Sequence, residues 1–344
     1  MARRPGEPFP LTAMRVTARA VSSAQKGSAR VRTVIGRVGF PYRAPTVPRG
    51  VEVPPAPKRT GADFDTEWAR RPLAQATRRA LLAGPLQLAV KAIADPEVVG
   101  TDRLADLRAE ADDTDDTCPC IFVANHHSHL DTPLMLAAIP PPWRHRMVVG
   151  AAADYFFGTR LTGAASALAL NAFPIDRTSV NRRSAELAAE LIRDGWSLVI
   201  FPEGGRSPDG WGQPFKGGAA FLAERTGAPI VPVHIDGTGA ILGKGMKRPK
   251  RGRTKVTFGR PLRLEEGENI RRFGTRIEAA VEVLADEAIS DYWSARRRAA
   301  QGATPSLTGP DYRGWRRAWA LTEHRARGKA GQRRRQKRTW PKLS

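Results

Sequence analysis

The chain has 344 residues, enough for one sizeable domain with extensions, and an ordinary hydrophobic fraction of 41%. Its net charge is +22, and its two cysteines, Cys118 and Cys120, make neither a disulfide framework nor a four-ligand zinc site. No run of 18 uncharged apolar residues occurs, so the sequence predicts no membrane-spanning helix.

Both ends of the chain are basic. Residues 1–50 hold ten Lys and Arg against one acid, and residues 304–344 hold twelve against two. Residues 1–60 are rich in Arg, Ala, Ser, Gly and Pro, a composition that buries little and predicts disorder. We therefore expect a basic, proline-rich extension over 1–60, a folded domain over 61–292 and a basic tail over 293–344. Such tails bind phosphates, either on an anionic membrane or on nucleic acid.

The folded domain is expected to begin with a helical pair over 63–96. Apolar residues recur there at helical spacing beside arginines, and Gly84-Pro85 interrupts the pattern. A basic amphipathic pair of this kind lies either on a membrane surface or against the rest of the domain. An acidic connector is predicted to follow over 106–116.

From Cys120 onward, short apolar runs alternate with helical patterns, which predicts an α/β fold with a mostly parallel sheet flanked by helices. Strands are predicted over 120–124, 146–150, 172–175, 197–201 and 230–235, with an edge strand over 255–258. Helices are predicted over 132–138, 155–170, 181–194, 219–226 and 269–292. Pro232 predicts an edge or a bulge in its strand, because proline cannot donate to a ladder.

The candidate catalytic residues lie in the segment NHHSHLD, which runs from Asn125 to Asp131. His126 lies where a strand passes into a helix, the edge at which α/β proteins place their chemistry. Asp131 can turn back to bind one imidazole nitrogen, which leaves the other available as a base near neutral pH. Ser128 is a rival nucleophile, although a serine here is also typical of a turn or a helix cap. The histidines of this segment have no acidic co-ligands nearby, so we expect no metal site.

Further strand ends carry groups suited to an anionic substrate. Arg177 follows the apolar stretch 172–175. After the strand 197–201, Gly204 would let a ligand approach the backbone closely, and Arg206 offers a planar fork suited to phosphate. Lys216 stands just before the next helix, whose N-terminus also favours anions.

Four segments together resemble the glycerophospholipid acyltransferase family typified by 1-acylglycerol-3-phosphate acyltransferases. NHHSHLD is similar to the family's first block, FPIDR to its second, FPEGGRS to its third and IVPVHIDG to its fourth. The blocks occur in the expected order within residues 65–285, and the basic tails lie outside the resemblance. The resemblance implies direct attack by the substrate's own hydroxyl, with His126 as the base and Asp131 as its orienting partner.

The resemblance also implies which residues bind the acceptor. Arg177, Gly204 and Arg206 match acceptor-binding positions, and the arginines would bind the glycerol phosphate. Glu203 matches as well and would orient Arg206 or a hydroxyl. Lys216 is a further candidate for the phosphate.

The activity implied is that of an O-acyltransferase that moves a fatty acyl group from acyl-CoA or acyl carrier protein to 1-acylglycerol 3-phosphate, giving phosphatidic acid. Glycerol 3-phosphate or another lysolipid is the alternative acceptor. No cofactor or metal is needed beyond the thioester co-substrate. The protein is expected at the cytoplasmic face of a membrane, peripheral or monotopic. The alternative from another functional class is a nucleic-acid-binding protein, which the net charge of +22 suggests. The folded middle argues against it, because aromatic and basic residues are not interleaved there.

Overall fold

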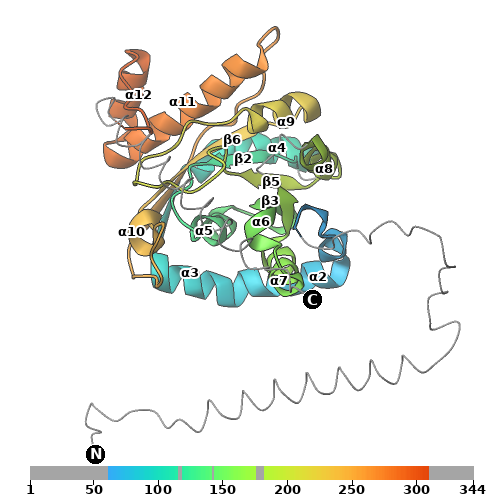
Figure 1. Cartoon of the computed structure of the whole chain (residues 1–344). Helices are drawn as coiled ribbons and strands as arrows, with labels where there is room; N and C mark the ends of the chain where they lie inside the picture. Colours follow the sequence, from blue (N-terminus) through green and yellow to red (C-terminus); the bar gives the residue numbers. More distant parts are fainter. Residues whose placement is uncertain (1–60, 115–117, 142, 176–181, 310–344) are drawn as a thin grey trace, which may run out of the picture. The chain divides into compact units, whose positions relative to one another are not determined.

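A computed structural model of the chain describes residues 61–114, 118–141, 143–175 and 182–309 (Figure 1). The extension predicted over 1–60 and the tail beyond residue 309 lie outside the described residues.

The described residues are built on a seven-stranded sheet in the order β1-β7-β6-β2-β5-β3-β4. Neighbouring strands are parallel except for β6 and β7, which are antiparallel, so the predicted mostly parallel sheet is confirmed. The strands are β1 (Pro96–Val99), β2 (Ile121–Ala124), β3 (Met147–Ala152), β4 (Ala172–Ile175), β5 (Ser197–Ile200), β6 (Ile230–Asp236) and β7 (Thr254–Phe258).

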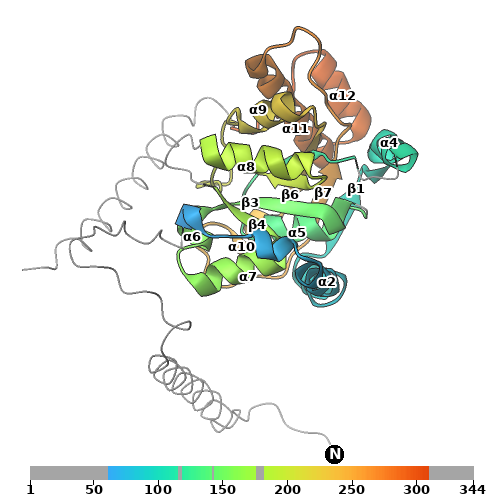
Figure 2. The ribbon, with the colours of Figure 1, turned by 90° about the vertical axis from the view of Figure 1, so that its right-hand side faces the viewer.

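Helices cover both faces of the sheet, because the central strands are apolar on both sides. In β2, Phe122 and Ala124 enter the core formed with α3, α5 and α10, whereas Ile121 and Val123 enter the core formed with α8, α9 and α11. Figure 2 shows α8 and α9 on one side of the sheet and α5, α7 and α2 on the other. The helices are α2 (Pro72–Leu81), α3 (Gln87–Ala94), α4 (Ala105–Thr114), α5 (Asp131–Ala138), α6 (Ala153–Phe156), α7 (Arg160–Leu170), α8 (Arg182–Arg193), α9 (Gly218–Thr226), α10 (Thr238–Leu242), α11 (Ile270–Ile289) and α12 (Tyr292–Ala300).

The predicted helical pair is present as α2 and α3. A π turn over Leu82–Leu86, which contains Pro85, joins the two helices. On one side α2 packs against α7 and α3 packs against α5, whereas the other side exposes Leu73 and Leu88. Each of the described helices is too short or too polar to cross a membrane.

The antiparallel end of the sheet differs from the prediction. The segment 255–258 is not an edge strand, because β7 pairs with β6 on one side and with β1 on the other. β6 is internal as well, so the edge predicted from Pro232 is wrong. The carbonyl of Pro232 accepts a hydrogen bond from Gly259 N–H at 2.8 Å. These two residues lie one position past the last residues paired between β6 and β7, Val233 and Phe258. The missing donor of Pro232 thus faces the end of the β7 ladder, where its loss is tolerated.

Three segments of the chain differ in secondary structure from what the sequence predicted. The acidic connector predicted over 106–116 is helical as α4 through Thr114. The single helix predicted over 155–170 is two helices, α6 and α7, because Thr159 caps the second one in a capping box with Thr162. The tail predicted from residue 293 begins inside α12, and ordered contacts continue to residue 309.

Those contacts explain why the domain extends past residue 292. Arg298 forms an ion pair with Asp286 of α11 at 2.6 Å, and Ala295 is fully buried. Leu307 N–H donates to Glu282 Oε1 at 3.1 Å, and Gly212 N–H donates to Leu307 O at 2.9 Å. The first part of the basic tail therefore packs on the domain.

Candidate active site

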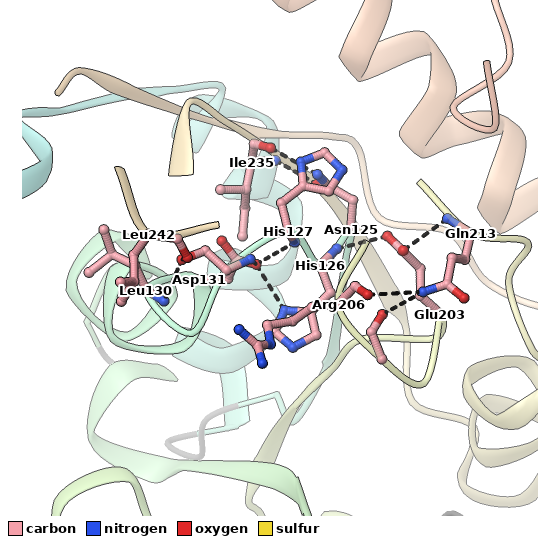
Figure 3. Close-up of polar contacts among 12 residues, drawn as sticks. Asn125, His126, His127, Leu130, Asp131, Glu203, Arg206, Gln213, Ile235 and Leu242 are labelled. Carbon is pink, nitrogen blue, oxygen red and sulfur yellow. Dashed lines mark hydrogen bonds and ion pairs between the residues drawn. The ribbon is translucent and has the colours of Figure 1, made fainter. Parts of the chain in front are cut away.

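Asp131 holds the NHHSHLD segment in a tight turn at the carboxyl end of β2 (Figure 3). Its Oδ2 accepts hydrogen bonds from His126 Nδ1 and from the backbone N–H groups of His127 and Ser128, each at 2.8 Å. Asp131 is fully buried and is the first residue of α5, where the helix N-terminus favours a negative charge. The contact expected between His126 and Asp131 is therefore present, in a turn that fixes the carboxylate.

The His126 ring is placed so that one nitrogen is open. A carboxylate can only accept, so the Asp131 contact puts the proton on Nδ1 and leaves the lone pair on Nε2. The ring stacks on Phe201, with ring centroids 4.3 Å apart and an angle of 19° between the planes. The side chain is 17% exposed, and Nε2 has no hydrogen-bond partner in the described part of the chain. This is the arrangement that a general base requires.

Asn125 ties the catalytic turn to the neighbouring strand. Its amide Nδ2 donates to Ile235 O, and its Oδ1 accepts from Ile235 N–H, both at 2.8 Å. The side chain is fully buried and continues the pairing of β2 with β6 after β2 itself has ended. The position of His126, the next residue, is thereby set by two strands.

Glu203 links the turn after β5 to the turn after β2. Its Oε1 accepts from His126 N–H at 2.8 Å, and its Oε2 accepts from Gln213 N–H at 2.9 Å. The side chain is only 2% exposed. Glu203 therefore binds backbone groups on both sides, and its predicted role in orienting Arg206 or a substrate hydroxyl stays a prediction.

The glycine and the cations of the third block surround the same turn. Gly204 has φ = +71°, which glycine adopts without strain, and Lys216 Nζ occupies the space that a side chain at residue 204 would need. Arg206 is half-buried and close enough to His129 to lower the pKa of that imidazole. Gly204, Arg206 and Lys216 thus lie around one turn, as expected of residues that bind one anionic group. Arg177 lies outside the described residues.

Burial lowers the pKa of the remaining histidines near the turn. Burial, with Arg206 as the next cause, lowers the pKa of His129 to about 4, and its ring stacks on Tyr155. Burial also lowers the pKa of His127 and brings that of His234 to about 4. Within the described residues, no group of His, Cys, Asp and Glu is arranged to hold a metal ion.

The site lies where the strand order reverses. β2 has β5 on one side and β6 on the other, all three parallel, so their carboxyl ends open at the same edge of the sheet. The chain leaves β2 towards β3 and β4, returns to β5, and then passes β2 to reach β6. Ligands of open α/β sheets bind in the crevice at such a switch point. His126 follows β2, and Glu203 and Arg206 follow β5.

Residues 97–236 match the family model described as Acyltransferase. The chain carries an acyltransferase-family domain. The matched range contains His126, Asp131, Glu203 and Arg206, and the resemblance read from the four blocks is confirmed.

Individual acyltransferases share this domain at modest identity. A chloroplastic 1-acyl-sn-glycerol-3-phosphate acyltransferase of Brassica napus is 31% identical over 147 residues, which are 42% of this chain and 41% of that protein. The 1-acyl-sn-glycerol-3-phosphate acyltransferase of Bacillus subtilis is 32% identical over 93 residues, which are 27% of this chain and 44% of that protein. The chain thus spans less than half the length of these curated relatives.

A solved structure was also found to be similar. The crystal structure of the 1-acyl-sn-glycerophosphate acyltransferase PlsC from Thermotoga maritima aligns at a TM-score of 0.47 with 23% identity. The alignment covers 65% of this chain and 83% of that chain.

Three residues with contacts in the candidate site were not among those predicted from the sequence. Asn125 and Phe201 lie within the blocks NHHSHLD and FPEGGRS, so their positions were a usable signal. Gln213 donates its backbone N–H to Glu203, and its side-chain Nε2 donates to Gly205 O at 3.0 Å and to Arg206 O at 3.3 Å. It lies outside the four blocks, and no sequence pattern predicts these contacts.

Proposed function

We propose that the acyltransferase-family domain moves a fatty acyl group from a thioester donor, acyl-CoA or acyl carrier protein, to the hydroxyl of 1-acylglycerol 3-phosphate, giving phosphatidic acid. The observation that carries this proposal is the imidazole of His126, bound by Asp131 at Nδ1 and open at Nε2. The names of the curated relatives support the choice of acceptor.

In this reaction, Nε2 of His126 takes the proton of the acceptor hydroxyl as its oxygen attacks the thioester carbonyl. The tetrahedral intermediate collapses by breaking the carbon–sulfur bond, and the imidazolium returns its proton to the departing sulfur. Asp131 stabilises the imidazolium between these steps. Since the acceptor supplies the nucleophilic oxygen, no serine of the enzyme is needed. Ser128 is already engaged, because its Oγ donates to Leu242 O and accepts from Leu130 N–H.

The acceptor's phosphate is the group that the cations of the third block would bind. Arg206 and Lys216 lie around the turn that Glu203 fastens to His126. A guanidinium binds two phosphate oxygens at once, so Arg206 would orient the glycerol backbone as well as attract it. Arg177 joins this proposal on the strength of its place in the second block.

We further propose that the enzyme works at the cytoplasmic face of a membrane, as a peripheral or monotopic protein, because its proposed substrates are lipids. Leu73 and Leu88 on the outer side of the helical pair support this placement, since they are 81% and 70% exposed. The basic tails add charge that favours an anionic leaflet.

An acceptor panel tests the proposal. The intact protein is given acyl-CoA or acyl carrier protein thioester with 1-acylglycerol 3-phosphate, glycerol 3-phosphate or a lysophosphatidylcholine, and lipid products are identified by mass. We expect the highest kcat/KM with 1-acylglycerol 3-phosphate. A higher value with glycerol 3-phosphate would establish the alternative acceptor. Binding to duplex DNA in preference to anionic vesicles, together with no acyl transfer to any acceptor, would refute the proposal.

A further inference from the structure

The loop between α10 and β7 carries a positive charge that the proposed acceptor site does not use. Residues 243–253, called the basic loop below, contain six Lys and Arg and no Asp or Glu. Four of these side chains are exposed and form no ion pair with any residue in the described part of the chain: Lys247, Arg248, Lys250 and Arg251. The basic loop is therefore a concentration of unneutralised charge on a folded part of the protein.

The basic loop begins at the catalytic turn itself. Ser128, two residues from His126, donates through Oγ to Leu242 O at 2.7 Å. Ser128 also pairs with Gly243 in an isolated antiparallel bridge. The loop therefore starts beside the segment that carries His126, and Lys247 follows four residues after Gly243.

The basic loop is also held in one conformation by its backbone. Met246 N–H donates to Gly243 O at 3.1 Å across a turn in which Gly245 has φ = +92°. Lys250 N–H donates to Ile241 O at 2.9 Å, and Gly252 N–H donates to Ile93 O of α3 at 3.0 Å. A loop fastened in this way presents its cations without first having to be ordered, which favours binding of an anion.

The loop and the acceptor site lie on opposite sides of β2. Arg206 and Lys216 follow β5, whereas the basic loop follows β6 and α10. His126, after β2, lies between them. Two separate groups of cations therefore flank one base, which fits a reaction in which two anionic substrates meet at that base.

The acceptor of the proposed reaction has one phosphate, and the loop would serve the other substrate. Coenzyme A joins the thiol, through its pantetheine arm, to a nucleotide that carries a diphosphate and a 3′-phosphate. Lysine and arginine are the side chains that bind such groups, arginine in a bidentate manner. We propose that the basic loop binds the nucleotide phosphates of a coenzyme A thioester, and that acyl-CoA is therefore the donor. This inference rests on the proposed function, because it takes the reaction to use a thioester.

Kinetics of a charge-neutralised loop test the proposal. In the full-length chain, Lys247→Gln, Arg248→Gln, Lys250→Gln and Arg251→Gln are combined. The control combines Arg225→Gln, Arg260→Gln, Arg271→Gln and Arg272→Gln, which remove the same charge from exposed positions near the amino ends of the strands. We expect the loop variant to raise the KM for acyl-CoA by roughly 10- to 100-fold, with kcat and the KM for the acceptor within about twofold of wild type. The control variant should leave all three unchanged within about twofold.

Donors and inhibitors that lack parts of the nucleotide locate the contact. Adenosine 3′,5′-bisphosphate should inhibit the wild type competitively against acyl-CoA, and should inhibit the loop variant much more weakly. An acyl thioester of dephospho-coenzyme A, which lacks the 3′-phosphate, should have a raised KM with the wild type but the same KM as acyl-CoA with the loop variant.

Three results would overturn the proposal. One is an unchanged KM for acyl-CoA in the loop variant. Another is a rise in the KM of both substrates that is as large in the control variant as in the loop variant, which would indicate an effect of net charge alone. The third is a loss of binding to vesicles containing anionic phospholipid, beyond that of the control and with donor kinetics unchanged, which makes the loop a membrane contact.

Binding measured without turnover separates this proposal from the proposed function. Calorimetric titration of the intact protein with adenosine 3′,5′-bisphosphate should show one site in the wild type and the control variant, and none in the loop variant. If the wild type binds this nucleotide through the loop but transfers no acyl group to any acceptor, the proposed function fails while the nucleotide site stands. If acyl transfer proceeds from acyl carrier protein alone and the nucleotide does not bind, the loop assignment fails and the acyltransferase activity stands.

Discussion

Glu203 joins two turns of the candidate site through its carboxylate. Both of its carboxylate oxygens accept backbone N–H groups, from His126 and Gln213, so it fastens the third block to the catalytic turn. A carboxylate is suited to this because it accepts on both oxygens, whereas a glutamine offers one acceptor and one NH₂ group that would face a donor. We therefore expect Glu203 to affect catalysis through the position of His126.

The first prediction concerns this carboxylate. Glu203→Gln should reduce the free energy of unfolding by about 1–3 kcal/mol, because a buried backbone N–H loses its acceptor. It should also lower kcat, while the KM for 1-acylglycerol 3-phosphate changes little. Urea unfolding and steady-state kinetics measure both, with the exposed Glu224→Gln as the control. A large rise in the acceptor KM at unchanged stability would instead place Glu203 on the substrate.

The buried histidines make the stability of the domain depend on pH. Burial lowers the pKa of His234 from its ordinary 6.5 to about 4, and Asp236 offsets only part of this effect. The unfolded chain therefore binds more protons than the folded protein between pH 6.5 and pH 4. The His234 contribution to stability is complete above pH 6.5 and is lost as the pH falls towards 4.

The second prediction follows from that sign. Between pH 7.5 and pH 4.5, the free energy of unfolding should fall less in His234→Gln than in the wild type, by up to about 3 kcal/mol. Urea denaturation at four pH values measures the slope. Equal slopes in the two proteins would show that His234 is not held neutral by the fold.

Among the elements, the attachment of α2 depends on a buried arginine. Arg78 is 5% exposed and donates to Leu168 O at 2.8 Å, to Ala69 O at 2.6 Å and to Ala167 O at 3.1 Å. It joins α2 to the carboxyl end of α7, where the helix dipole favours a cation. Its neighbour Arg79 is exposed. The helical pair is therefore fastened to the domain by polar contacts as well as by apolar ones.

The third prediction compares these two arginines. Arg78→Met should lower the free energy of unfolding by about 2 kcal/mol, because three carbonyls lose a charged donor. Arg79→Met, on the same helix, should change it by less than about 0.5 kcal/mol. Denaturant midpoints measure both. Equal effects would mean that α2 is held mainly by its apolar contacts.

The parts of the fold that could be predicted are those encoded in local patterns. β2 with its turn and α5 followed from an apolar run, a polar segment and a proline in the first helical turn. β1 was missed because Pro96 and Glu97 obscure a four-residue strand whose stability comes from pairing with β7, about 160 residues later. α4 was missed because its acidic composition gives no clear apolar stripe. The link from Glu203 to His126 spans 77 residues, and no sequence period reports such a contact.

For the whole molecule, most of the net charge lies in the two tails, outside the four blocks. The basic tails flank a middle that contains all four blocks, and the site residues lie in that middle. Each Lys or Arg near an anionic leaflet contributes on the order of 1 kcal/mol, which falls off within a Debye length. We therefore expect the tails to strengthen binding to an anionic membrane without taking part in the chemistry.

The fourth prediction concerns these tails. Deleting residues 1–60 and 310–344 should weaken binding to anionic vesicles and make the remaining binding less sensitive to salt. Activity on detergent-dispersed substrate should survive, since all four blocks and the contacts of α12 with the domain are kept. Vesicle sedimentation at low and high salt measures the first effect. Unchanged binding at low salt would transfer the attachment to the outer side of α2 and α3.

The proposed reaction depends most on His126, as the base for acyl transfer to a lipid hydroxyl. Its most direct test is the kcat of His126→Ala with 1-acylglycerol 3-phosphate and acyl-CoA, in a protein whose unfolding midpoint matches the wild type. Loss of a general base should lower kcat by roughly 10²–10⁴-fold, whereas His129→Ala, which changes a nearby histidine with no contact to Asp131 Oδ2, should lower it by less than about tenfold. A folded His126→Ala protein with near-wild-type turnover would exclude His126 as the base.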